Sequence, residues 1–260
     1  MPSLHLDHHK LFFADRRPPG KTPTMLLIHG AAGSHAIWPQ TFFNIPDIRV
    51  MALDLPGHGL STPPGRRTIE QYAIATEEFI AALGLENITL VGHSMGSAIA
   101  LTIALRGAAD VRNLALLGAS ARMPVHESVL RNAINAPDEL AAFVAANGLG
   151  QATAELQGII QREAQATDAT TVFGDFFACN RFDLRPRLSA IDIPTLVIAG
   201  ALDRMTPLRF SESLAAGLPQ AQLITLEGTG HFAMLERPDE VKSLIAGFIN
   251  DKASTELKAR

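Results

Sequence analysis

A serine between two glycines, in the sequence Gly92-His93-Ser94-Met95-Gly96, is the first group of residues that could do chemistry. The apolar run at residues 88–91 predicts a strand before it, and the small apolar residues 95–105 predict a helix after it. A serine on such a turn is lifted clear of a sheet, and the glycines let backbone and helix approach closely. We therefore predict that Ser94 is a nucleophile and that the Met95 amide faces the oxyanion formed by its attack.

A serine with its ordinary pKa is a weak nucleophile, so it needs a base within hydrogen-bond reach. Among the nine histidines, His231 is the candidate base, because it lies in a glycine-flanked loop between the last strand-like run and the last helical segment. A structural role is expected for His93, His29 and His58, whereas His35 and His126 are kept as residues that could face a substrate.

An acid is expected between the nucleophile and the base along the chain, at the end of a strand. Asp203 fits this position, because it directly follows the strand-like run at residues 195–199. Its carboxylate would hold the tautomer of His231 and stabilise the imidazolium that forms during attack. Glu227, which is close to His231 in sequence, is the rival, and Asp192 lies at the wrong end of the same strand.

The elements that must position these residues alternate between strand and helix along most of the chain. This alternation is typical of an α/β protein with a mostly parallel, doubly wound sheet. A hairpin is expected at residues 4–14, turning near residues 7–10. The other strand-like runs are residues 25–28, 49–53, 88–91, 114–117, 195–199 and 223–226, and the helical segments among them are 69–83, 95–105 and 238–248.

One stretch, residues 121–186, contains no convincing strand. Its helical segments are expected at residues 127–136, 138–147, 152–165 and 170–179. A block of helices after one strand of a parallel sheet predicts a cap over the edge of that sheet. We therefore divide the chain into a core of residues 1–120 and 187–260 and a helical cap of residues 121–186. An independent second domain is less expected, because no linker separates the helices from the rest.

The composition narrows the classes of partner. Hydrophobic residues make up 47% of the 260 residues and charged residues 18%, which is typical of a globular chain and not of a disordered one. The net charge is −4 and no basic stripe is present, so nucleic acid is not an expected partner. The single cysteine, Cys179, is expected to be buried and apolar. Neither a signal peptide nor a run long enough to span a membrane is seen, so we expect a cytoplasmic protein without membrane association.

The chain resembles the α/β-hydrolase superfamily, in the branch with a helical cap after the sixth strand. Besides the serine motif, four landmarks carry the resemblance over residues from about 25 to 250: Leu26-Leu27-Ile28-His29-Gly30, Asp54-Leu55-Pro56-Gly57-His58-Gly59, Gly200-Ala201-Leu202-Asp203 and Gly228-Thr229-Gly230-His231. The resemblance implies that the Ala31 amide joins that of Met95 in the oxyanion hole, with Ala32 as the near alternative. It implies no cofactor, and no metal-ligand spacing is seen in the sequence.

The resemblance further implies a serine hydrolase that acts on a small-molecule acyl substrate, and a carboxylic ester is the expected one. Lactones, thioesters and carbon–carbon bonds remain alternatives, although the carbon–carbon hydrolases usually carry Trp where Phe232 follows the base. A small-molecule receptor that retains the triad is also left open. Trp38, Phe143 and Phe177 are the candidate substrate-binding residues. The substrate and the oligomeric state are not determined by the sequence.

Overall fold

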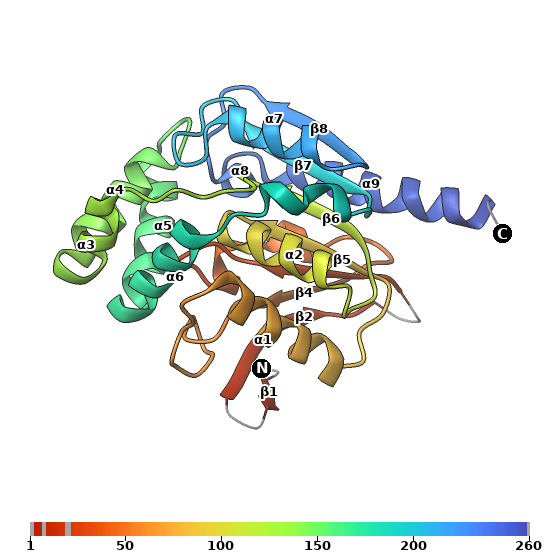
Figure 1. The fold of residues 1–260 in the computed structure, drawn as a ribbon, viewed down its shortest axis with the longest axis horizontal. Coiled ribbons are helices and arrows are strands. Elements are labelled where there is room, and N and C mark those ends of the chain that lie inside the picture. Colours follow the sequence, from red (N-terminus) through yellow and green to blue (C-terminus); the bar gives the residue numbers. More distant parts are fainter. Residues whose placement is uncertain (1–2, 7–8, 19–21, 259–260) are drawn as a thin grey trace.

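A sheet of eight strands forms the centre of the computed structural model, which describes residues 3–6, 9–18 and 22–258 (Figure 1). The strand order is β1-β2-β4-β3-β5-β6-β7-β8. Strands β3 to β8 are parallel, whereas β2 is antiparallel to both β1 and β4. The strands are β1 Ser3–Leu6, β2 His9–Arg16, β3 Thr24–Ile28, β4 Arg49–Leu53, β5 Ile88–His93, β6 Val111–Leu117, β7 Thr195–Gly200 and β8 Ala221–Leu226.

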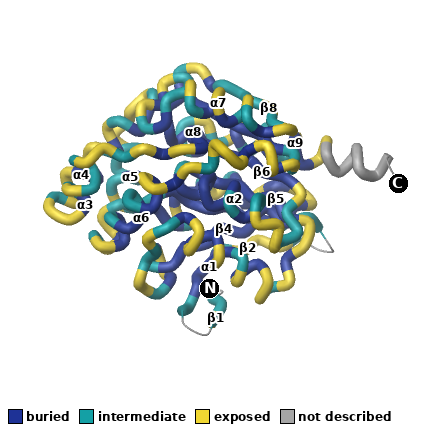
Figure 2. The backbone as a smooth tube through the Cα atoms, viewed as in Figure 1, coloured by how far each residue is buried: buried dark blue, intermediate teal, exposed yellow. Residues whose placement is uncertain are grey.

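Both faces of the sheet are buried, because successive residues of the central strands are apolar. In β3, Leu26 and Ile28 belong to one core cluster, and Met25 and Leu27 belong to a second. Side chains of a strand alternate between the two faces, so each cluster lies on its own side of the sheet. The dark blue centre of Figure 2 shows this continuous burial. The prediction of a doubly wound, mostly parallel α/β sheet is confirmed.

Helices cover the two faces of the sheet. Leu101 of α2 and Leu214 of α7 pack in the first cluster together with α1, whereas Val241 and Ile245 of α9 pack in the second together with α8. These helices are α1 Ile69–Ala82, α2 Met95–Arg106, α7 Leu208–Gly217, α8 Ala233–Glu236 and α9 Pro238–Lys258. Three 3₁₀ turns, which the periodicity of the sequence did not predict, are η1 His35–Ile37, η2 Gln40–Phe43 and η3 Arg185–Ala190.

A helical cap follows β6, the sixth strand, as predicted, and gathers at one end of the sheet (Figure 1, green to teal). Its helices are α3 Glu127–Asn135, α4 Pro137–Asn147, α5 Ala154–Ala166 and α6 Ala169–Arg181. Leu140 and Val172 of the cap share a small apolar cluster with Ala32 of the core. The exact division at residues 121–186 stays a prediction. The predicted N-terminal hairpin is formed by β1 and β2, and its turn at residues 7–8 lies outside the described residues.

Candidate active site

Ser94 lies on a sharp turn between β5 and α2. Its φ of 51° and ψ of −117° are a strained combination that non-glycine residues rarely adopt. The turn is fixed by neighbours, since the Ser94 amide donates to the Leu117 carbonyl at 2.9 Å. Gly96 allows the helix to approach β3, because a Cβ on Gly96 would lie 2.1 Å from the Ile28 carbonyl oxygen. The two observations explain why a strained serine is held at this position.

His231 and Asp203 form a buried hydrogen-bonded pair. Nδ1 of His231 lies 2.8 Å from Oδ2 of Asp203, and the two residues are 3% and 6% exposed. Oδ1 of Asp203 accepts the amides of Met205 and Thr206, each at 2.8 Å. Burial alone would raise the pKa of Asp203, but the nearby His231 and these hydrogen bonds hold it below its usual value. The carboxylate therefore faces Nδ1 in its charged form.

Thr206 is a positioning residue that the sequence reasoning missed. Its hydroxyl lies 2.7 Å from Oδ2 of Asp203, 3.0 Å from the Gly118 carbonyl oxygen and 3.1 Å from Nδ1 of His231. The imidazole also lies close to the backbone of Gly118, since a Cβ on this residue would be 2.8 Å from the ring. A threonine three residues after the acid was the only signal in the sequence.

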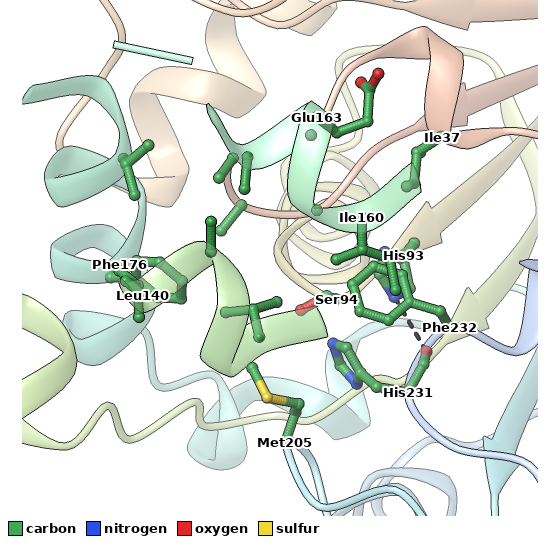
Figure 3. A pocket seen from close by; sticks show the side chains of 18 of the residues that line it. Ile37, His93, Ser94, Leu140, Ile160, Glu163, Phe176, Met205, His231 and Phe232 are labelled. Carbon is green, nitrogen blue, oxygen red and sulfur yellow. Dashed lines mark hydrogen bonds between the residues drawn. The ribbon is translucent and has the colours of Figure 1, made fainter. Parts of the chain in front are cut away.

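His93 is hydrogen-bonded to the loop of His231. Its Nε2 donates to the His231 carbonyl oxygen at 3.1 Å, the dashed line in Figure 3, and the two rings are 4.8 Å apart. Burial, followed by the proximity of His231, lowers the pKa of His93 well below its usual value. His93 is thus a neutral structural group, the role that the sequence predicted for it.

The loop after β3 carries the candidate oxyanion donors. Ala32 has a φ of 56°, and its amide donates to Oδ2 of Asp175 at 2.9 Å. The Gly33 amide donates to the Gly30 carbonyl at 3.2 Å, which tightens the turn. Because the Ala32 amide is bonded to a carboxylate, Ala31 is the better candidate of the two for a donor to an oxyanion.

Asp175 of α6 is a fully buried carboxylate that the sequence analysis did not single out. Besides the Ala32 amide, it accepts the Tyr72 hydroxyl at 2.5 Å and faces Nε2 of His58 at 2.8 Å. Burial lowers the pKa of His58, but the charge and hydrogen bond of Asp175 outweigh it and raise this pKa. The position of this acidic residue among the apolar residues of α6 was a feature of the sequence from which Asp175 could have been predicted.

The loop of His231 is also bonded to the cap. The His231 amide donates to the Gly148 carbonyl at the end of α4, at 2.7 Å. The two carboxylate oxygens of Glu236 accept the Gly230 amide at 2.7 Å and the Gly150 amide at 2.9 Å. The cap is therefore joined by hydrogen bonds to the base loop as well as to the oxyanion loop.

Two pockets meet at Ser94 and His231, and Phe176 and Met205 line both of them. The first, which we call the enclosed pocket because it is the less open of the two, has a volume of about 60 Å³ (Figure 3). Its side-chain walls are mostly apolar, and Glu163 is the charged residue outside the catalytic group. The labelled walls include Ile37, Leu140, Ile160, Phe176, Met205 and Phe232. The second, open pocket has a volume of about 280 Å³ and extends along the loop before α3.

Of the three residues predicted to bind substrate, one lines a pocket at Ser94 and two do not. Phe143 is half exposed and lines the open pocket. Trp38 is buried in the core against Phe42, and Phe177 stacks on Phe173, so both lie outside the two pockets at Ser94. Phe176, one position before Phe177, faces the pockets instead. The rotation of α6 about its axis determines which of the two phenylalanines faces the pockets.

His29, His35 and His126 have different surroundings. His29 bonds backbone as predicted, since its Nδ1 donates to the Gly30 carbonyl and its Nε2 accepts the Leu55 amide. Burial lowers the pKa of His29 to about 4. His35 is turned to Asp54, at 2.9 Å, and is not in either pocket, whereas His126 lines the open pocket.

Two kinds of feature are absent from the described residues, namely membrane-spanning helices and groups of metal ligands. No helix within the described ranges is long and apolar enough to cross a membrane. In the same part of the chain, no three His, Cys, Asp or Glu side chains are grouped so that they could hold a metal ion.

Comparisons with known proteins agree over nearly the whole chain. A model described as the Alpha/beta hydrolase family matches residues 25–244. The AB hydrolase superfamily protein YisY of Bacillus subtilis (strain 168) is 29% identical over 94% of this chain and 97% of that protein. The structure of a thermophilic esterase is 26% identical with a TM-score of 0.84, covering 96% of this chain and 97% of its own. The enol-lactonase of Burkholderia xenovorans LB400, at 23% identity, shares the fold with a TM-score of 0.87 and covers 96% of this chain and 100% of its own.

Proposed function

Because the chain belongs to the alpha/beta hydrolase family, we propose that it is a serine hydrolase that cleaves a carboxylic ester through an acyl-Ser94 intermediate. Ser94 attacks the carbonyl carbon while Nε2 of His231 takes the hydroxyl proton. The amides of Ala31 and Met95 donate hydrogen bonds to the tetrahedral oxyanion. His231 returns the proton to the departing alcohol, and water repeats the sequence to release the acid.

The observation that carries this proposal is the 2.8 Å bond between His231 and Asp203, beside a pocket that Ser94 and His231 line together. A carboxylate on Nδ1 leaves Nε2 as the nitrogen that exchanges a proton with the nucleophile. The strained backbone of Ser94 is a second support, because strain of this kind is stored where it serves a reaction.

We assign the enclosed pocket to the acyl group and the open pocket to the departing alcohol. The enclosed pocket is lined by the oxyanion loop, including Gly30 and Ala31, and its other walls are mostly apolar. Its small volume of about 60 Å³ favours short acyl groups. The open pocket gives the alcohol a path to solvent.

The test is the hydrolysis of p-nitrophenyl esters of increasing acyl length, with lactones and thioesters in parallel, by the wild type and Ser94→Ala. We expect short esters to be the best substrates, and we expect Ser94→Ala to lose about 10⁴-fold or more in kcat. Ser213→Ala, on the exposed surface of α7, is the matched control and should retain full activity.

Activity of Ser94→Ala within a few-fold of wild type would overturn the assignment of the nucleophile. A preference for lactones or thioesters would keep the triad and change the bond. If no compound is turned over but small molecules bind tightly, the chain is a receptor that retains the triad.

A further inference from the structure

The two pockets at Ser94 differ in charge. The enclosed pocket is lined by Glu163, whose Oε2 accepts the Ser34 hydroxyl at 2.5 Å, and no lysine or arginine is among the described residues that line it. The open pocket is lined by Arg122 and Arg204, together with His126, and no Asp or Glu is among its described lining residues. The chain as a whole has a net charge of −4, so a cationic pocket is a local feature.

The fold brings the two arginines to one edge of the sheet. Arg122 follows β6 and Arg204 follows β7, and these strands are paired in parallel, with Leu117 opposite Ile198. The carboxyl ends of paired parallel strands meet at the same edge, where α/β proteins bind their ligands. Both arginines therefore reach the same pocket from neighbouring loops.

The backbone at each arginine is anchored. Ser120 donates its hydroxyl to the Arg122 carbonyl at 2.6 Å, and a β-bridge joins Arg122 to Asp183. On the other side, the carboxylate of Asp203 accepts the two amides that follow Arg204. Fixed attachment points reduce the entropy that the side chains lose when they bind an anion.

Neither guanidinium is neutralised by an ion pair. Within the described part of the chain, no carboxylate lies within 4.0 Å of Arg122 or Arg204 in a salt bridge. Asp183, the bridge partner of Arg122, is paired with Arg185, and Arg185 chiefly, with a smaller contribution from Arg122, lowers its pKa. Asp203, which precedes Arg204, is paired with His231. Among the described residues, neither arginine therefore has a salt bridge that an anionic ligand would have to displace.

We propose that Arg122 and Arg204 bind a carboxylate on the alcohol portion of the substrate, so that the protein prefers esters whose leaving group is anionic. The inference rests on the proposed function. A carboxylate matches the planar donors of a guanidinium. The acyl side is disfavoured for this carboxylate, because it would be enclosed with Glu163.

The test compares 4-acetoxybenzoate with its neutral methyl ester, which carry the same acyl group. The measured quantity is the ratio of kcat/KM for the anionic to the neutral ester, because changes common to both substrates cancel. We expect Arg122→Gln and Arg204→Gln each to lower this ratio about fivefold, and the double variant about tenfold or more. Added salt should lower the ratio in the wild type. Arg131→Gln, on the exposed surface of α3 and outside both pockets, is the control and should leave it unchanged.

A ratio that stays within twofold of wild type in the double variant would overturn the proposal. The mono-p-nitrophenyl ester of succinic acid, compared with p-nitrophenyl butyrate, tests the placement. If the arginine variants change that ratio and not the first, the carboxylate binds on the acyl side and the proposal is wrong.

Binding to Ser94→Ala separates this inference from the proposed function. Calorimetric titration of 4-hydroxybenzoate and of its methyl ester needs no turnover. We expect the anion to bind more tightly, and we expect Arg122→Gln and Arg204→Gln in this background to remove the difference. Equal affinities would overturn the anion site, whereas an anion preference without any esterase activity in the wild type would overturn only the proposed reaction.

Discussion

At the scale of single residues, the site depends on Asp203, because both oxygens of its carboxylate have hydrogen-bond partners. Its Oδ1 accepts two backbone amides, and its Oδ2 faces the Thr206 hydroxyl and Nδ1 of His231. The carboxylate is therefore fixed before it meets the imidazole. A carboxylate fixed in this way holds one tautomer and one orientation of His231.

Replacing Asp203 by Asn is expected to lower kcat by about three to four orders of magnitude. The amide can present an N–H to Nδ1, which would move the imidazole proton to Nε2, the nitrogen that we propose as the acceptor of the Ser94 proton. The measurement is kcat on the best ester of the panel. Glu227→Gln is the control, since Glu227 is the rival acid and its replacement should change kcat less than about threefold.

At the scale of elements, the cap helices form hydrogen bonds to the two loops of the site as well as covering it. Asp175 of α6 fixes the Ala32 amide, and the end of α4 accepts the amide of His231 through Gly148. The two loops thus take their position from helices that lie far from them in the sequence. This arrangement explains how Ala32 is held at a φ of 56°.

Asp175→Asn is expected to lower kcat about tenfold to a hundredfold, because an amide cannot accept from all three of its present donors and the oxyanion loop shifts. The measurement is kcat and KM on a short ester, with circular dichroism to show that the variant is folded. Asp168→Ala, at the exposed start of the same helix, removes a cap bond to Thr170 without contact to the loop. If both variants lose the same activity, Asp175 acts only through the stability of α6.

At the scale of the whole molecule, two apolar clusters hold the sheet from both faces, and a buried charged pair crosses from core to cap. That pair is His58 and Asp175 at 2.8 Å. Both nitrogens of His58 face acceptors, since Nδ1 lies 3.1 Å from the Pro56 carbonyl oxygen. The imidazole is therefore suited to its protonated form, in agreement with its raised pKa.

This pair predicts how stability depends on pH. Because the pKa of His58 is higher in the folded than in the unfolded chain, its contribution is fully present below about pH 6.5 and is lost as the pH rises through the folded pKa. The difference in free energy of unfolding between wild type and Asp175→Asn should thus be larger at pH 6 than at pH 9. Urea unfolding at the two pH values measures it. An equal difference at both would show that the pair carries no proton-linked stability.

Local patterns of the sequence were enough to predict most of the architecture. The alternation of apolar runs and helical periodicities depends on near neighbours, so α1 and α2 begin at Ile69 and Met95 as expected. The motif around Ser94 and the order of Asp203 and His231 likewise follow from short stretches at strand ends, and the pair of Asp203 and His231 is joined in the structure.

Only the tertiary structure decided which residues from distant segments meet. Asp175 and Ala32 are separated by 143 positions, and no local pattern of charge or periodicity joins them. The rotation of α6 about its axis, which packing sets, turned Phe176 toward the site in place of Phe177. The sequence by itself was enough to predict the candidate nucleophile, its expected partners and the sheet that carries them. The cap contacts and the charge of each pocket arise from long-range packing. The free energy of this packing is shared among many residues that are far apart in the sequence, so no single segment predicts it.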